Sequence, residues 1–152
     1  MCDDFDSVCE GFFKNFGDHR HMVLSTCSDG NVSSRMMCVI QLDGLFYFQT
    51  DRTMKKYRQL MENPSVALCA DNLQIEGSSR ELGHPLAHKA FTECYSRCFN
   101  NSFLNYSSLS NERLFVVEPN FIQKWVYEDG VPYVERFDFP LRQYSKIQYV
   151  GR

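Results

Sequence analysis

The chain has 152 residues, of which 43% are hydrophobic and 23% are charged, and its formal net charge is −3. This length predicts one domain, residues 1–152, with a single hydrophobic core. The acidic balance excludes a pervasive basic surface, and no apolar run is long enough to cross a bilayer, so we expect neither a nucleic-acid nor a membrane partner. The seven cysteines are an odd number and no secretion signal precedes them, so we expect reduced thiols in a cytoplasmic protein.

The first part of the chain combines one helical pattern with three strand patterns. Apolar residues recur at helical spacing over residues 4–16, which predicts an N-terminal helix within residues 1–17. Three strands are then predicted, at residues 22–26, 33–41 and 45–50. Asp43-Gly44 is a strong hairpin signal between the last two, so we expect an antiparallel meander.

A basic helix is predicted after the third strand, ending before Pro64. It carries four basic residues and no acidic one before Met61: Arg52, Lys55, Lys56 and Arg58. Thr50 and Thr53 stand at the turn into this helix, where free N–H groups and the helix dipole attract anions. Together with an arginine from a neighbouring strand, the pattern predicts a phosphate site. The alternative is a solvated basic helix face that Thr53 caps.

The rest of the chain adds strands and one further helical region. Four strands are predicted, at residues 65–70, 73–82, 114–118 and 121–127. Gly77 is expected to form a bulge, and Pro119 separates the last two strands. A helix is predicted over residues 86–99, a loop over residues 100–110 and an aromatic-rich C-terminal tail over residues 132–152. Six or seven strands with singly inserted helices predict a mainly β fold, a small antiparallel barrel with flanking helices.

Several histidines and cysteines stand at spacings that metal sites use. His19 and His21 share one face of a strand, but no third ligand is apparent, and His84 is expected to begin the second helix instead. Cys94 and Cys98 lie one helical turn apart, where we expect core packing rather than redox chemistry. We therefore predict no metal site.

The order and spacing of these motifs match a known pattern. The matching segments are RMMCVI from Arg35, FQT ending at Thr50, TxK from Thr53, LMENP ending at Pro64, IEG ending at Gly77, and Trp125 before a Glu-Asp-Gly turn. The chain thereby resembles the pyridoxamine 5'-phosphate oxidase-like flavoproteins, in particular a short bacterial branch similar to stress proteins. The resemblance covers residues 22–130 and implies the FMN-binding split β-barrel.

The resemblance also implies FMN as cofactor and a homodimer with flavin at the subunit interface. In this family an arginine, a hydroxyl residue and a helix lysine hold the flavin phosphate, which here are Arg35, Thr53 and Lys55. Other cofactor contacts are implied for Met36, Met37, Cys38 and Val39, whose backbone faces the flavin ring, for Gln49 and Thr50 near the phosphate or ribityl chain, and for Asn72 and Trp125.

For activity, the resemblance implies an FMN-dependent oxidoreductase acting on an unidentified small molecule. The substrate-binding residues of the true oxidase have no match, and Ile40 replaces its lysine at the end of the arginine strand. A non-catalytic flavin-binding or stress-response protein is therefore an open alternative. A haem-binding barrel is another, with His19, His21 or His84 as axial ligand. No catalytic residue is assigned, and a deazaflavin presents the same phosphate and tricyclic ring as FMN.

Overall fold

The computed structural model describes residues 4–151. Its elements follow one another along the chain as α1 (Asp4–Phe16), β1 (His19–Ser28), β2 (Asn31–Leu42), β3 (Leu45–Asp51), α2 (Lys55–Glu62), β4 (Ser65–Ala70), β5 (Leu73–Gly83), η1 (Pro85–Ala87), α3 (Lys89–Cys98), α4 (Asn100–Ser102), η2 (Phe103–Ser107), β6 (Glu112–Glu128), β7 (Val131–Asp138) and β8 (Gln143–Gln148). The predicted N-terminal helix and the first five predicted strands all form.

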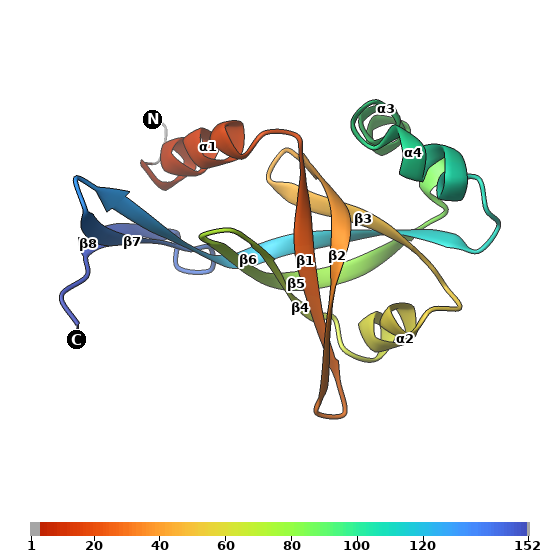
Figure 1. The fold of residues 1–152 in the computed structure, drawn as a ribbon, viewed down its shortest axis with the longest axis horizontal. Helices are drawn as coiled ribbons and strands as arrows, with labels where there is room; N and C mark the ends of the chain where they lie inside the picture. Colours follow the sequence, from red (N-terminus) through yellow and green to blue (C-terminus); the bar gives the residue numbers. More distant parts are fainter. Residues whose placement is uncertain (1–3, 152) are drawn as a thin grey trace.

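One antiparallel sheet contains every strand within residues 4–151. Its eight strands follow the order β3-β2-β1-β4-β5-β6-β7-β8, and an additional pairing of β3 with β6 closes strands β1 to β6 into a barrel. The remaining two strands, β7 and β8, form a hairpin that extends away from the barrel (Figure 1). The predicted antiparallel barrel with flanking helices is confirmed. The strand count exceeds the predicted six or seven because the aromatic-rich tail forms β7 and β8.

The tight hairpins depend on residues that adopt a left-handed backbone. Asp43 and Gly44 have φ of 52° and 82°, as a two-residue type I′ turn requires, so the hairpin predicted from this dipeptide is confirmed. Gly77 fulfils a different requirement, because a Cβ there would lie 2.5 Å from the Glu118 carbonyl oxygen. The register of β5 against β6 shifts at Gly77, so the predicted bulge is confirmed as well.

Two clusters of buried side chains hold the fold together. The main core fills the barrel and is covered at one side by α1, whose Phe5 and Phe16 are 6% and 4% exposed. The second cluster lies outside the barrel wall, where Phe91 and Tyr95 of α3 pack against Ile40 of β2. The helices at the two sides of the barrel are therefore docked by separate sets of apolar contacts.

Three predictions about the second half of the chain are wrong. Residues 100–107, expected to be loop, form α4 and η2, with Ser107 buried against the barrel. The two strands expected around Pro119 are one long strand, β6. Pro119 is tolerated within it because it faces the bulge at Gly77, where the ladder of hydrogen bonds is interrupted. The predicted helix over residues 86–99 is split into η1 and α3. Among the described residues, no helix combines the length and apolar character needed to span a membrane.

Candidate functional site

One edge of β2 has no strand beside it along most of its length. Strand β2 pairs with β1 along residues 31–40, whereas it pairs with β3 only from Ile40 to Leu42. Residues 36–39, whose backbone is predicted to face a flavin ring, lie on this open edge. Their side chains alternate, with Met37 and Val39 buried in the core and Met36 61% exposed. Backbone N–H and C=O groups on such an edge are available to a ligand or a second chain.

Helix α2 faces this region with one particular side. Lys56, Gln59 and Leu60 stand at i, i+3 and i+4, so they share one face of the helix. Leu60 belongs to the main core, and Gln59 is only 3% exposed. Lys56 is half-buried, whereas Lys55 is exposed and turned away from it. The helix therefore directs Lys56, not Lys55, toward the barrel.

Arg35 is held in place by the same helix. Its Nη1 donates to Thr26 Oγ1 at 2.9 Å and to the Leu24 carbonyl at 3.3 Å, and its Nη2 donates to Gln59 Oε1 at 3.2 Å. Thr26 also donates to Gln59 Oε1, at 2.7 Å. The Gln59 side chain therefore fixes a guanidinium from β2 beside α2. A positioned guanidinium of this kind is well suited to bind a phosphate group.

Thr50 contributes an unpaired hydroxyl to the region. Its side chain is 3% exposed, and its Oγ1 has no hydrogen-bond partner within residues 4–151. Thr50 and Lys56 line a hollow of about 320 Å³ together with Gln49, Asp51, Met54, Tyr95, Tyr106, Leu109 and Glu112. A buried hydroxyl without a partner costs about 1–3 kcal/mol, so a ligand oxygen that paired with it would be bound with corresponding preference.

The start of α2 is suited to an anion. Its N-cap residue, Met54, makes no side-chain capping hydrogen bond, so the N–H groups of the first turn are left for other partners. Burial lowers the pKa of the Lys56 ammonium, and the nearby Arg35 guanidinium lowers it further. Burial likewise raises the pKa of the Glu112 carboxyl, which Lys56 partly opposes. An anion placed between Arg35 and Lys56 relieves the repulsion between these two cations.

The structure does not bring the other predicted phosphate ligands to this place. The backbone N–H and the hydroxyl of Thr53 both donate to Asp51 Oδ1, at 2.7 and 2.6 Å. Lys55 lines a separate hollow of about 270 Å³ with Arg58, Gln59 and Glu62. The helix begins at Lys55, later than the predicted cap at Thr53, and each residue of offset rotates the side chain by about 100°.

Asn72 and Trp125 lie together in another part of the barrel. The Asn72 side-chain amide donates to the Trp125 carbonyl, and the Trp125 N–H donates to the Asn72 carbonyl at 3.2 Å. The Trp125 ring contacts Tyr149 edge to face. Gln49 does line the hollow, and its Oε1 accepts a hydrogen bond from Ser107 at 2.9 Å.

Sequence reasoning assigned no cofactor contact to seven residues that line the hollow: Asp51, Met54, Lys56, Tyr95, Tyr106, Leu109 and Glu112. Lys56 belongs to the basic run that the sequence singled out, and an i, i+3, i+4 pattern with Gln59 and Leu60 would have indicated it. Nothing in the sequence places Tyr106 or Leu109 there, because the residues around them read as polar loop.

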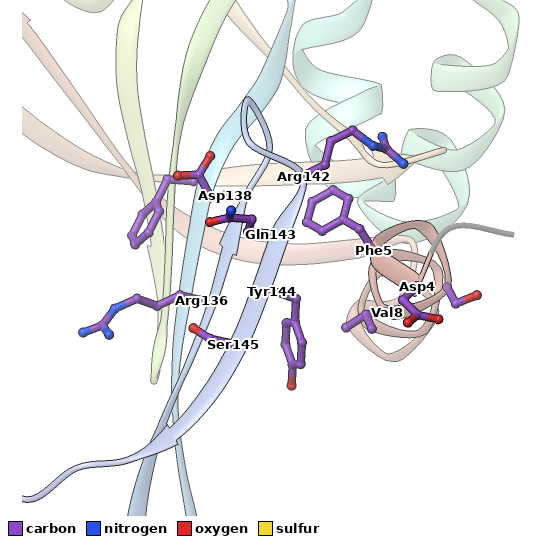
Figure 2. A pocket seen from close by; sticks show the side chains of 11 residues that line it. Asp4, Phe5, Val8, Arg136, Asp138, Arg142, Gln143, Tyr144 and Ser145 are labelled. Atoms are coloured by element: carbon purple, nitrogen blue, oxygen red, sulfur yellow. The ribbon is translucent and has the colours of Figure 1, made fainter.

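A larger cleft, of about 850 Å³, lies elsewhere (Figure 2). It separates the start of α1, with Phe5 and Val8, from the β7–β8 hairpin, with Arg136 and Tyr144. None of the predicted cofactor residues lines this cleft. The hollow at α2 is smaller, but the half-buried Lys56 and the unpaired Thr50 hydroxyl both line it and Arg35 lies nearby, so we take it as the candidate site.

The histidines considered as haem ligands differ in availability. Both ring nitrogens of His84 are engaged, Nδ1 accepting from the Leu86 N–H at 3.2 Å and Nε2 lying 2.9 Å from the Leu109 carbonyl. His84 caps the η1 turn, so its predicted place at the start of a helical segment is confirmed. His19 and His21 both contact the Phe99 ring edge to face, outside the barrel.

Comparison with known proteins gives the family. The family model described as pyridoxamine 5'-phosphate oxidase matches residues 10–126. No curated protein matches the chain in sequence.

Among solved structures, the chain resembles a pyridoxamine 5'-phosphate oxidase-related, FMN-binding protein from Nostoc punctiforme, with 12% identity, a TM-score of 0.59 and coverage of 87% of each chain. General Stress Protein 26 from Bacillus anthracis is 23% identical, with a TM-score of 0.56 over 70% of this chain and 84% of that one. HutZ, a haem storage protein from Vibrio cholerae, is 15% identical, with a TM-score of 0.58 over 65% and 80%. These likenesses concern the fold, and the family match covers most of the chain: it belongs to the pyridoxamine 5'-phosphate oxidase family.

Proposed function

We propose that the protein binds FMN and acts as an oxidoreductase on a small molecule. The observation that carries this proposal is that the half-buried Lys56 and the unpaired Thr50 hydroxyl line one hollow at the start of α2, with the Arg35 guanidinium near enough to lower the pKa of Lys56. Two cations and a hydroxyl around uncapped helix N–H groups suit a phosphate dianion. The family match and the description of the Nostoc relative as FMN-binding support the same cofactor.

The open edge of β2 supplies the second requirement of a flavin. Residues 36–39 lie on it with unpaired backbone groups, and the polar rim of an isoalloxazine ring needs such donors and acceptors. Tyr95 and Tyr106 line the adjoining hollow and offer aromatic surface. Bound flavin supplies hydride and electron transfer, and the protein contributes binding and orientation.

We further propose that the working unit is a homodimer. The outward face of β2 and β1 carries Val32 and Met36, 71% and 61% exposed, with Val23 opposite Met36. A second copy of the chain that covered this face would remove apolar surface and an open strand edge from water. Asn72 and Trp125 lie apart from Arg35 within one chain, so a contact of theirs with the same flavin would be made from the second copy.

The substrate differs from that of the true oxidase. Ile40, at the position of its substrate-binding lysine, is fully buried beneath α3 and belongs to the second apolar cluster. No cation can therefore meet a substrate phosphate from this position. The small molecule oxidised or reduced by this protein is accordingly not recognised through a phosphate at Ile40.

FMN binding is tested against riboflavin, which lacks the phosphate. The purified protein is mixed with either flavin and desalted, and retained flavin is measured by visible absorption. We expect FMN to be retained and riboflavin to be lost. Lys56→Met should weaken FMN binding at least about tenfold, the loss of a charge-assisted hydrogen bond, and Lys55→Met, its matched neighbour, should change it less than about twofold. Equal retention of both flavins, or equal effects of the two variants, would contradict the phosphate site.

The alternatives give different outcomes in the same preparation. Reduction of the bound flavin by NADH or NADPH, followed by reoxidation with an electron acceptor, supports the oxidoreductase. Bound flavin that no donor reduces favours a non-catalytic flavin-binding protein. A Soret band in the purified protein identifies haem instead, and light scattering decides between monomer and dimer.

A further inference from the structure

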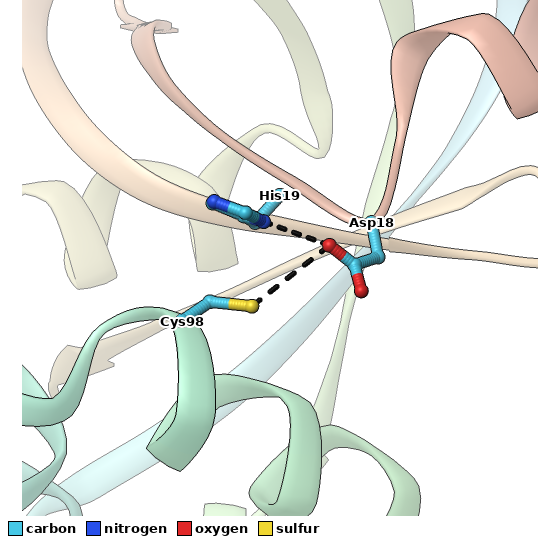
Figure 3. Close-up of side chains that lie close together, drawn as sticks. All are labelled: Asp18, His19 and Cys98. Atoms are coloured by element: carbon cyan, nitrogen blue, oxygen red, sulfur yellow. Dashed lines mark hydrogen bonds and ion pairs between the residues drawn. The ribbon is translucent and has the colours of Figure 1, made fainter.

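A second cluster of reactive side chains lies between the start of β1 and helix α3. The proposed flavin site does not use it. Asp18 and His19 stand where α1 turns into β1, and Cys94 and Cys98 stand one turn apart on α3. The Asp18 carboxylate, the His19 ring nitrogen and the Cys98 sulfur all lie within 4.8 Å of one another (Figure 3). The Cys94 and Cys98 sulfurs are 3.9 Å apart. From these contacts we propose that Asp18, His19, Cys94 and Cys98 form a binding site for a thiophilic dication such as Zn²⁺.

Two of the separations between these ligand atoms are close to those around a tetrahedral ion, whereas Cys94 lies outside the group of three and must approach Asp18 Oδ1 and His19 Nδ1 to complete the site. With metal–sulfur bonds of about 2.3 Å, two sulfurs at adjacent corners of a tetrahedron are about 3.8 Å apart. The two cysteine sulfurs are at 3.9 Å, and the Cys98 sulfur is 3.8 Å from Asp18 Oδ1. Asp18 Oδ1 and His19 Nδ1 are closer, at 2.7 Å, and must part by about 0.6 Å to admit the ion. Both side chains are about half exposed, so this rearrangement meets little resistance.

Each half of the cluster is held by its own surroundings. The Asp18 carbonyl accepts from the Gln41 N–H at 2.9 Å, and the Gln41 side chain donates to the Gly17 carbonyl at 2.7 Å, which fixes the corner. On the other side, Phe91 and Tyr95 dock α3 against the barrel. The ligands are therefore brought together by contacts that do not involve a metal, which lowers the ordering cost of binding one.

The charges around the cluster balance. Two thiolates and one carboxylate around a dication give a net charge of −1, and Arg97 lies beside them. Its Nη2 donates to Asp18 Oδ2 at 2.9 Å and lies 3.7 Å from the Cys94 sulfur, while Oδ1 faces His19 and Cys98. Arg97 does not itself bind the ion, but its hydrogen bond to Asp18 Oδ2 orients the carboxylate so that Oδ1 can bind it. Mixed sulfur, nitrogen and oxygen ligands favour Zn²⁺ over Mg²⁺ or Ca²⁺.

The sequence contains these four residues, but no local pattern in it indicates that the fold brings them together. His19 lacked a third ligand in its own neighbourhood, and Cys94 and Cys98 read as helix core. The predicted absence of a metal site did not consider that α3 would dock against the start of β1. Binding a dication there would link the segment between β5 and β6 to the start of the barrel.

The test uses the full chain, reduced and stripped of metal with a chelator. Zn²⁺ is titrated in competition with a chromophoric chelator, and Co²⁺ is added separately to record its spectrum. We expect one equivalent of Zn²⁺ per chain, and for Co²⁺ the intense visible bands of tetrahedral coordination with thiolate charge transfer. Cys94→Ser and Cys98→Ser should each weaken Zn²⁺ binding more than about 100-fold. This exceeds the loss expected when a residue that only hydrogen-bonds to a metal ligand is replaced.

Two further variants keep the test decisive. Cys69→Ser removes an exposed thiol outside the cluster and should leave the affinity unchanged. His19→Gln changes an exposed side chain and should weaken binding even where a buried cysteine variant fails to fold. The proposal is overturned if the reduced protein binds no Zn²⁺, if binding survives both cysteine variants, or if Cys69→Ser weakens it equally. Isolation of a Cys94–Cys98 disulfide whose reduction yields no Zn²⁺ binding would overturn it as well.

Discussion

The helices α2 and α3 are both inserted between strands of the barrel, but they are attached to it in opposite ways. Helix α3 buries aromatic side chains, with Phe91 2% and Tyr95 4% exposed, in an apolar cluster outside the wall. Helix α2 buries an amide, Gln59, which accepts hydrogen bonds from Thr26 and Arg35. One helix is therefore fixed mainly by the hydrophobic effect, and the other by the apolar contact of Leu60 together with polar contacts that also hold a cation in position.

This difference indicates which role each helix has in addition to stabilising the fold. The apolar cluster of α3 leaves its other side free to bring cysteines to the start of β1, although the attachment also buries the phenol of Tyr95. The polar attachment of α2 stabilises less per contact, because hydrogen bonds within the protein replace hydrogen bonds to water. It does, however, orient Arg35 toward the same place as Lys56. Substitutions at the two attachments should separate these roles.

The largest expected effect is at the aromatic attachment. Phe91→Ala removes a nearly fully buried ring and should lower the free energy of unfolding by about 3–5 kcal/mol, through lost burial and the cavity left behind. Denaturant unfolding at equilibrium measures this change. The control is Leu86→Ala on η1, where the side chain is 46% exposed and the expected change is within about 0.5 kcal/mol. Equal losses for the two variants would show that α3 is not held by this cluster.

A smaller loss is expected at the polar attachment, together with a functional one. Gln59→Leu removes the acceptor of Thr26 and Arg35 and leaves both donors in a buried region, which should cost about 1–3 kcal/mol in unfolding free energy. FMN retention should fall as well, because Arg35 loses the contact that positions it. Arg58→Ala, an exposed cation on the same helix, should change neither quantity appreciably. Unchanged flavin binding in Gln59→Leu would show that Arg35 is positioned without Gln59.

Much of the barrel could be predicted from the sequence because its signals are local. Asp43-Gly44 defines a two-residue hairpin, Gly77 marks a bulge, and alternation of apolar residues identifies most strands. The signal failed where tertiary contacts decide the structure. Residues 100–107 are polar in sequence, yet they form helical turns because Ser107 packs against Gln49 of the barrel. Pro119 reads as a strand end, yet its partner Gly77 lets β6 continue through it.

The kind of candidate site could be predicted from the sequence, but most of the residues that form it could not. The run of basic residues after Thr50 predicts an anion site at α2, where the candidate hollow lies. The choice between Lys55 and Lys56 depends on where the helix begins, and a shift of one residue turns the side chain by about 100°. Residues such as Tyr106 and Glu112 reach the hollow from elements far away in the sequence. Whether these side chains reach the hollow depends on how the segment between β5 and β6 packs, and no local pattern specifies that packing.

The smallest expected effect concerns Glu112, which borders the hollow that the two attachments share. Burial raises the pKa of its carboxyl, and Asp51 raises it further. A group whose pKa is raised by folding stabilises the folded state while it is protonated, and this contribution is lost as the pH rises through the raised pKa. Glu112→Gln should therefore increase the unfolding free energy at neutral pH, by less than about 1 kcal/mol because Lys56 already offsets part of the carboxylate's cost.

The pH at which the difference appears distinguishes this cause from others. At about pH 3, more than a unit below the ordinary pKa of a glutamate, the carboxyl is almost fully protonated in both folded and unfolded chains, and wild type and Glu112→Gln should be equally stable. Above the raised pKa the variant should be the more stable. The same change removes a negative charge beside Lys56, so FMN should bind more tightly to the variant at neutral pH. A variant that is equally stable at the acidic pH but less stable at neutral pH would show that the Glu112 carboxylate is held by its neighbours as a favourable charge, and the hollow would then be suited to a cation rather than to a phosphate.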